Sequence, residues 1–227
     1  MMLQTMAVAD HYRQSQPSLQ PTAWRMQRAA HMKMMLRSFL ISAAFLFFTC
    51  AGAHAHLVPG DVRGFGSGFA HPLHGLDHLL AMTAVGLWAV QLGGRARWLV
   101  PASFVGVMIV GGALAMSGLR IPFVEEGVFL SVLVLGILIT VAARFPLAAS
   151  MAIVGLFAIF HGHSHGTEMP VNAVGFAYGA GFALATAALH GCGIGLACVA
   201  QSVRLPVVRW AGAAIAVAGI CLWALYS

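Results

Sequence analysis

Long apolar stretches separated by short polar breaks make up most of the chain after residue 67. They cover residues 68–92, 98–117, 127–143, 145–161, 171–199 and 207–226. A helix needs about 20 residues to cross the hydrocarbon core of a bilayer. The pattern therefore predicts an all-α, polytopic membrane helix bundle with six transmembrane helices. The fourth stretch is short, so a re-entrant segment is an alternative there, and the fifth is long enough to tilt or bend.

The segment before the first stretch has the features of a secretory signal. Lys33 and Arg37 precede the apolar run 39–48, and Ala53-His54-Ala55 is a small-x-small cleavage site. We predict a cleavable signal peptide, with an uncleaved membrane anchor as the alternative. A polar extension precedes the signal segment. Met34 and Met35 lie where a natural translation start would fall, which suggests that the start has been assigned too far upstream. The predicted division is an extension at 1–32, a signal peptide at 33–55 and a six-span transporter domain at 56–227.

Composition agrees with a membrane protein. Of 227 residues, 60% are hydrophobic and only 8% are charged, far fewer charges than a soluble domain carries. The formal net charge is +6, but the basic residues are scattered singly and form no patch with aromatic residues. We therefore expect the lipid bilayer, and no nucleic acid, as a partner. The four cysteines lie in the signal segment or in apolar stretches and do not indicate a disulfide framework.

The basic residues also predict the orientation of the chain. If the mature amino terminus is outside, the loops place five arginines inside and two outside. The inside set is Arg95, Arg97, Arg144, Arg204 and Arg209, and the outside set is Arg63 and Arg120. An excess of basic residues marks cytoplasmic loops. We therefore predict a multi-pass protein of the bacterial cytoplasmic (inner) membrane whose mature amino and carboxyl termini are both periplasmic.

The first apolar stretch opens with the motif H-P-L-H-G-L-D-H, which contains His71, His74, Asp77 and His78. Ionisable groups are costly in a membrane and mark pathways or sites, and imidazole and carboxylate bind nickel, cobalt and zinc. On an ideal helix the three imidazoles fall within about 60 degrees of one another but spread over about 10 Å. A subset must then bind one ion, or the ion must step along the stripe. The alternative is a set of interfacial histidines bonded to loops and water.

A second motif, F-H-G-H-S-H-G-T-E at 160–168, contains His161, His163, His165 and Glu168. The predicted topology places it between spans four and five, on the same exported side as the first motif. Alternating histidine and glycine suit a flexible, ligand-bearing loop. The alternative is a surface loop that merely collects metal.

Three further residues are weaker candidates. His190, late in the fifth stretch, is either a deeper ligand or proton-handling group, or a buried histidine bonded to a backbone carbonyl. Glu125 faces outward and either recruits cations or is simply solvated, like Glu126. His56 becomes the mature amino terminus if the signal is cleaved, and its amine and imidazole then form a chelating pair.

With these two motifs the sequence resembles the HupE/UreJ family of bacterial nickel permeases. The resemblance rests on His71 followed after five residues by Asp77-His78, and on F-H-G-H-S-H-G-T-E. It covers the chain from about residue 57 to the carboxyl terminus. Ser164 stands where the family has alanine or valine, a departure that touches no ligand.

The resemblance implies import of Ni²⁺, or in some members Co²⁺, for hydrogenase, urease or cobalamin synthesis. The ion is then a substrate, and no permanent cofactor is expected. The ligand candidates that the resemblance implies are His71, Asp77, His78, His165 and Glu168, followed by His161, His163 and Glu125, with Phe104 at an aromatic position of the family pattern.

The leading hypothesis is a permease and not an enzyme. The chain has no phosphate-binding loop of the form G-x-x-x-x-G-K-[ST], so ATP-driven pumping by this chain alone is not expected. One alternative is an intramembrane zinc hydrolase with Asp77 or Glu168 as general base. Another is a metal sensor or buffer without transport. Because imidazole and carboxylate suit both ions, the sequence leaves nickel and cobalt as equal candidates.

Overall fold

The structure is a computed structural model that describes residues 64–168, 175–202 and 207–226. All of them belong to one unit of the chain, Cys50–Ser227. The predicted extension, the signal peptide and His56 lie outside the described residues.

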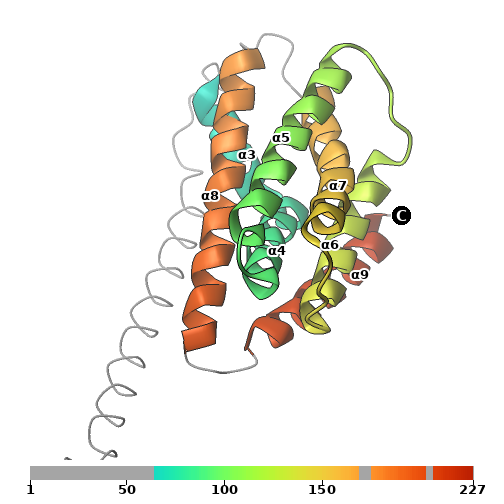
Figure 1. Cartoon of the computed structure of the whole chain (residues 1–227). Coiled ribbons are helices and arrows are strands. Elements are labelled where there is room, and N and C mark those ends of the chain that lie inside the picture. The colour runs from blue at the N-terminus through green and yellow to red at the C-terminus, as the bar shows by residue number, and fades with distance from the viewer. Residues whose placement is uncertain (1–63, 169–174, 203–206, 227) are drawn as a thin grey trace, which may run out of the picture. The chain divides into compact units, whose positions relative to one another are not determined.

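Every regular element in the described ranges is a helix, which confirms the predicted all-α class (Figure 1). In chain order the helices are α3 (Phe65–His74), α4 (Leu76–Leu92), α5 (Ala96–Met116), α6 (Val124–Thr140), α7 (Leu147–Glu168), α8 (Gly175–Ser202) and α9 (Val207–Tyr226).

Most of these helices have the length and composition of membrane spans. Four of them, α5, α7, α8 and α9, are long and apolar enough to cross a membrane, and α3 with α4 adds a fifth if the bent pair is one span. Helix α6 has 17 residues, somewhat fewer than the roughly 20 that a perpendicular crossing needs. The polytopic membrane bundle is confirmed, whereas six crossings stay a prediction.

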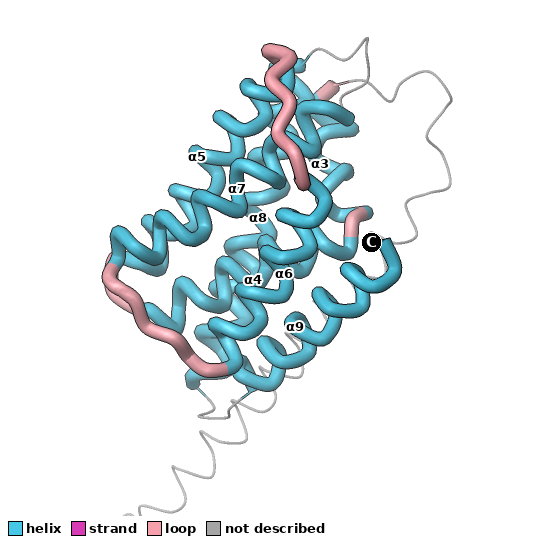
Figure 2. Tube along the Cα trace, turned by 90° about the vertical axis from the view of Figure 1, so that its right-hand side faces the viewer, coloured by secondary structure: helices cyan, strands magenta, loops and turns pink. Residues whose placement is uncertain are grey.

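Glycines bring the helices into close contact. A side chain at Gly162 of α7 would collide with the Met108 carbonyl of α5, and one at Gly86 of α4 would collide with the His190 carbonyl of α8. Small residues let membrane helices approach in this way. Helix α7 therefore packs closely on α5, while α8 contacts both α3 and α4 (Figure 1). Helix α9 lies beside α6 (Figure 2).

The first predicted span is broken at Gly75. Its backbone is extended, with φ −87° and ψ 116°, and the axes of α3 and α4 differ by 87°. A side chain at Gly75 would lie 2.8 Å from both Asp77 Oδ1 and His78 Nδ1. The expectation of one continuous helix with three imidazoles on a single stripe is therefore wrong, because His71 and His74 belong to α3 and His78 to α4.

The second motif is helical and not a loop. Helix α7 runs for 22 residues and continues through the motif to Glu168. A side chain at Gly166 would meet Gly112 and Ala115 of α5 at 2.6–2.7 Å, and Gly162 lies one turn earlier against the same helix. The glycines thus serve helix packing, which corrects both the flexible loop and the short fourth span.

The arginine-bearing end of the bundle lies far from the first motif. Near the end of α4, the Gln91 side chain donates a hydrogen bond to the Ile139 carbonyl at 3.1 Å, and Arg209 donates to the Thr140 carbonyl at 2.7 Å. His78 stands thirteen residues before Gln91 on α4, about 20 Å along the helix axis. His78 of α4 and Arg209 of α9 therefore occupy opposite ends of the bundle.

Candidate metal site

Four imidazoles from three helices form a cluster. The ring of His78 on α4 lies 4.3 Å from the His165 ring and 4.8 Å from the His161 ring, both on α7, measured between centroids. His71 on α3 lies 4.7 Å from His165. We call these four residues the histidine cluster. It unites both sequence motifs, because the break at Gly75 and the extension of α7 bring their histidines together.

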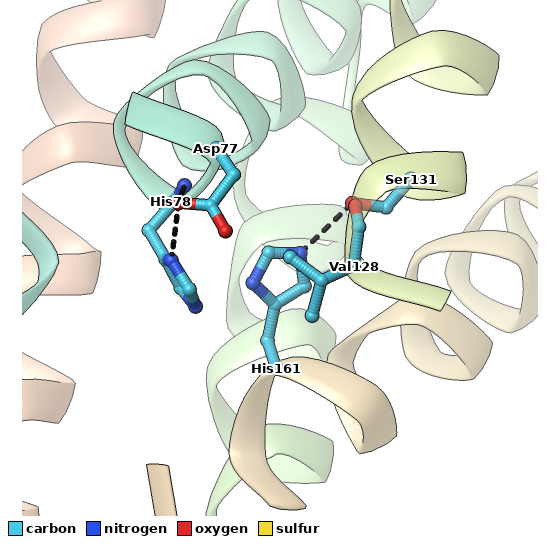
Figure 3. Close-up of polar contacts among 5 residues, drawn as sticks. All are labelled: Asp77, His78, Val128, Ser131 and His161. Carbon is cyan, nitrogen blue, oxygen red and sulfur yellow. Dashed lines mark hydrogen bonds and ion pairs between the residues drawn. The ribbon is translucent and has the colours of Figure 1, made fainter. Parts of the chain in front are cut away.

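Asp77 holds the His78 ring in place (Figure 3). The Nδ1–H of His78 donates a hydrogen bond to Asp77 Oδ1 at 2.8 Å. In a neutral imidazole the other nitrogen then carries the lone pair. His78 Nε2 is buried and has no hydrogen-bond partner among the described residues. A carboxylate behind a histidine whose second nitrogen is unpartnered is the usual arrangement of a metal-binding histidine.

Ser131 of α6 orients the His161 ring in the same manner. The Ser131 hydroxyl donates to the Val128 carbonyl at 2.6 Å, so His161 Nε2–H donates to Ser131 Oγ at 2.8 Å. The lone pair of His161 is then on Nδ1, which is buried and lacks a partner within the described ranges. Figure 3 shows the His78 and His161 rings facing the space between α4 and α7. Both rings therefore offer a lone pair close to the other.

Aromatic rings cover the cluster. Phe182 of α8 lies 3.8 Å from the His165 ring, Phe104 of α5 lies 5.6 Å from the His161 ring, and Tyr178 lies 6.0 Å from the His71 ring. His161 is fully buried, and His165 is 3% exposed. The apolar wall removes bulk water from the imidazoles, which strengthens any electrostatic interaction inside.

A largely apolar cleft adjoins the cluster between α5, α7 and α8. Its volume is about 340 Å³, and His165 lines it together with Met108, Tyr178 and Phe182. The His165 ring thus borders both the histidine cluster and this cleft.

The imidazoles do not form a closed coordination sphere in this conformation. Across the described parts of the chain, no three His, Cys, Asp or Glu side chains are positioned to hold one ion. The neighbouring rings meet edge to face instead. Coordination of one ion by three of these side chains therefore requires a different arrangement of the rings.

Several predicted ligands lie apart from the cluster. His74 is exposed and donates from Nδ1 to the Ala70 carbonyl of its own helix at 2.7 Å. His163 turns toward the loop after α5 and donates from Nε2 to the Leu119 carbonyl at 2.8 Å. Glu125 is exposed in the first turn of α6. Glu168 is the last residue of α7, and the structure does not describe its side chain. His56 lies outside the described residues.

His190 lies deeper, on α8. Its imidazole is 2% exposed and contacts the Phe104 ring edge to face at a centroid distance of 5.1 Å. The sequence alternative, a buried histidine bonded to a backbone carbonyl, does not hold, since neither ring nitrogen has a hydrogen-bond partner in the described residues.

Sequence reasoning missed Ser131 and Phe182. Ser131 is a fully buried hydroxyl near the middle of α6, within the apolar run 127–139, and such an isolated polar residue is a signal that could have been followed. Phe182 carries no signal, because phenylalanine is ordinary in an apolar helix.

Comparison with known proteins gives one consistent result. A sequence model of the family described as HupE / UreJ protein matches residues 43–222. The chain is 46% identical over 171 residues to Protein HupE of Rhizobium leguminosarum bv. viciae. The aligned region covers 75% of this chain and 89% of that protein. No solved structure matches the chain significantly.

Proposed function

The chain belongs to the HupE/UreJ family, and on this premise we propose that it is a permease that imports Ni²⁺ or Co²⁺ across the bacterial cytoplasmic membrane. The histidine cluster is its periplasmic entrance. The ion is a substrate, and the protein is a transporter and not an enzyme.

The observation that carries this proposal is the pair of oriented lone pairs on His78 and His161. The two residues come from motifs more than eighty residues apart in the sequence, yet their rings lie 4.8 Å apart. Each ring is held by a hydrogen bond that its other nitrogen donates, to Asp77 Oδ1 from His78 and to Ser131 Oγ from His161. Neutral imidazole is a preferred ligand of nickel and cobalt. The pair is therefore a preformed part of a binding site for such an ion.

The chemistry of the histidine cluster suits a transported cation. An ion that enters the cluster exchanges water for imidazole nitrogen, and the charge of Asp77 offsets part of the cost of bringing a dication into the bundle. Conduction requires binding that is strong enough to remove water but weak enough to permit release. A set of neighbouring imidazoles without a closed sphere satisfies both conditions.

Uptake by proteoliposomes tests the proposal. We expect vesicles with the purified protein to accumulate Ni²⁺ or Co²⁺. The initial uptake rate of the double variant Asp77→Ala/His78→Ala should be at least tenfold lower than that of the wild type. His74→Ala is the matched control, because His74 lies in the same motif but is exposed and bonded to its own helix. Competition between nickel, cobalt and zinc identifies the preferred ion.

Three results would each contradict part of this proposal. Unchanged uptake in the double variant excludes the histidine cluster as the entrance. Tight, stoichiometric zinc that survives chelation indicates the zinc hydrolase instead. Metal binding in detergent without accumulation in vesicles indicates a sensor or buffer.

A further inference from the structure

The bundle contains a buried histidine, His190, that the entrance does not use. It is 2% exposed, and both of its ring nitrogens lack hydrogen-bond partners within the described residues. Leaving a buried polar group without a hydrogen-bond partner destabilises the fold. Such a cost in the middle of an apolar helix calls for a functional reason.

His190 lies about two helical turns deeper than the histidine cluster, judged along two independent helices. On α8 it follows Phe182, the neighbour of His165, by eight residues, which is about 12 Å along the axis. On α4 its backbone carbonyl packs against Gly86, which follows His78 by eight residues. Both helices place His190 between the cluster and the arginine-bearing end.

Phe104 connects the two levels. Its ring contacts His161 of the cluster at 5.6 Å and His190 at 5.1 Å, and it is fully buried. The Phe104 ring therefore contacts one histidine at each level. Rotation of one aromatic side chain is a smaller change than a movement of helices.

Buried neutral donors lie near His190, and no carboxylate of the described residues forms a hydrogen bond with its ring. One turn before His190 on α8, the Thr186 hydroxyl donates to the Met108 thioether sulfur at 3.7 Å, and both residues are buried. The acidic residues after the signal segment are Asp61, Asp77, Glu125, Glu126 and Glu168. None of these is within eight residues of His190, Thr186 or Met108 in the sequence, and Asp77 stands at the outer end of α4.

We propose that His190 is a second, weaker station for the transported cation, separated from the histidine cluster by the Phe104 ring. The proposal rests on the permease function and extends it from an entrance to a path. Neutral donors hold a dication less strongly than a site with a carboxylate, so the ion passes from a site that captures it to one that releases it. Two stations of unequal strength meet the requirement that conduction places on binding.

Titration of the purified, full-length protein with Co²⁺ tests the station without relying on transport. The visible absorption of bound Co²⁺ is the probe. We expect the wild type to bind one Co²⁺ at a strong site and another at a weaker site. His190→Leu should lose only the weaker site, and Asp77→Ala/His78→Ala should lose only the stronger one. His190→Gln, which keeps a similar volume, is the second variant if leucine prevents folding. Leu189→Ala is the matched control, because it removes buried volume beside His190 without removing a metal donor.

Uptake into proteoliposomes adds the second readout. We expect His190→Leu to reduce the initial rate at least tenfold while the affinity of the strong site changes less than twofold. The proposal for His190 is wrong if the wild type shows only one class of Co²⁺-binding site. It is also wrong if the titration curves of the wild type and of both folded His190 variants are identical. If the wild type shows both classes but takes up no metal, the permease is wrong and the His190 metal site stands.

Discussion

The Ser131 hydroxyl decides which nitrogen of His161 faces the histidine cluster. Because it donates to the Val128 carbonyl, it accepts from His161 Nε2–H and leaves the lone pair on Nδ1. In Ser131→Ala the ring loses this partner and can present either nitrogen. Loss of such an outer partner typically lowers metal affinity about 10- to 100-fold. Titration of the purified variant with Ni²⁺ or Co²⁺ measures the change in Kd.

Ser150→Ala is the control for this substitution. Ser150 is also buried in the bundle, but its hydroxyl bonds to the Pro146 carbonyl at 3.2 Å, near the start of α7 and far along the helix from His161. We expect its metal affinity to equal that of the wild type. An equal loss in both variants would show that any removed hydroxyl has this effect and would refute the orienting role of Ser131.

The sequence predicted which histidines belong to the candidate site better than how their rings are oriented. Histidines in an apolar segment are unusual enough to indicate a site from composition alone. The hydrogen bond between Ser131 and His161, however, joins residues thirty positions apart on different helices, and a tertiary contact of this kind leaves no local pattern. The separation of His163 from His165 likewise depends on which face of α7 meets α5.

At the level of the elements, the break at Gly75 shapes the entrance. A Cβ at this position would lie 2.8 Å from Asp77 Oδ1 and His78 Nδ1, closer than real Cβ contacts allow. In Gly75→Ala the Asp77–His78 pair must shift, and a small displacement of an oriented group has a large effect on its site. We expect uptake to fall at least tenfold in the proteoliposome assay.

Gly66→Ala serves as the comparison, because Gly66 lies on the adjoining helix α3 and a Cβ there meets nothing within 4 Å. Its uptake should match the wild type. Wild-type uptake in Gly75→Ala as well would mean that the Asp77–His78 geometry is not needed at the entrance.

The contact between α5 and α7 depends on Gly162. A side chain there would collide with the Met108 carbonyl, whereas one at Gly155 of the same helix meets only Val107 Cγ2, at an ordinary 3.6 Å. Overpacking a close interface costs about 1–3 kcal/mol. We expect Gly162→Ala to lower the Tm in detergent clearly and Gly155→Ala to leave it nearly unchanged. Equal Tm values for the two variants would contradict the close packing.

The apolar stretches predicted the existence of the helices but not their interruptions and extensions. Glycine and histidine in 161–168 are compatible with a loop and with a packed helix, and periodicity over so short a segment does not separate the two. The recurrence of Gly162 and Gly166 four residues apart, parallel to His161 and His165, was the available signal for a helix. The bend at Gly75 depends on how α3 and α4 each pack against α8, which the local sequence does not encode.

Across the described part of the molecule, the charged residues of the helices divide between the two ends of the bundle. The acidic residues of the described helices lie near the end that carries the histidine cluster, His190 lies deeper, and Arg209 bonds to the Thr140 carbonyl at the opposite end. A cation that enters at the cluster thus leaves its compensating carboxylate behind before it approaches the basic end. We infer that the weaker inner station favours release, and the orientation of the bundle then decides between import and export.

Cysteine labelling determines this orientation. The excess of inside arginines predicts that the loop with Arg120 is periplasmic and the loop with Arg95 cytoplasmic. Both residues are exposed, so Arg120→Cys and Arg95→Cys, made in a chain whose four native cysteines are replaced by alanine, present accessible thiols. We expect a membrane-impermeant maleimide to label Arg120→Cys in intact cells and Arg95→Cys only after lysis.

The label at position 120 also locates the histidine cluster. His163 of α7 bonds to the Leu119 carbonyl, so this loop is attached to the helix that carries His161 and His165. Labelling of Arg120→Cys from outside therefore places the cluster at the periplasmic end, where an importer must capture its ion. The reverse pattern, with Arg95→Cys labelled in intact cells, would direct the cluster toward the cytoplasm, contradict the positive-inside assignment and make export the direction to test.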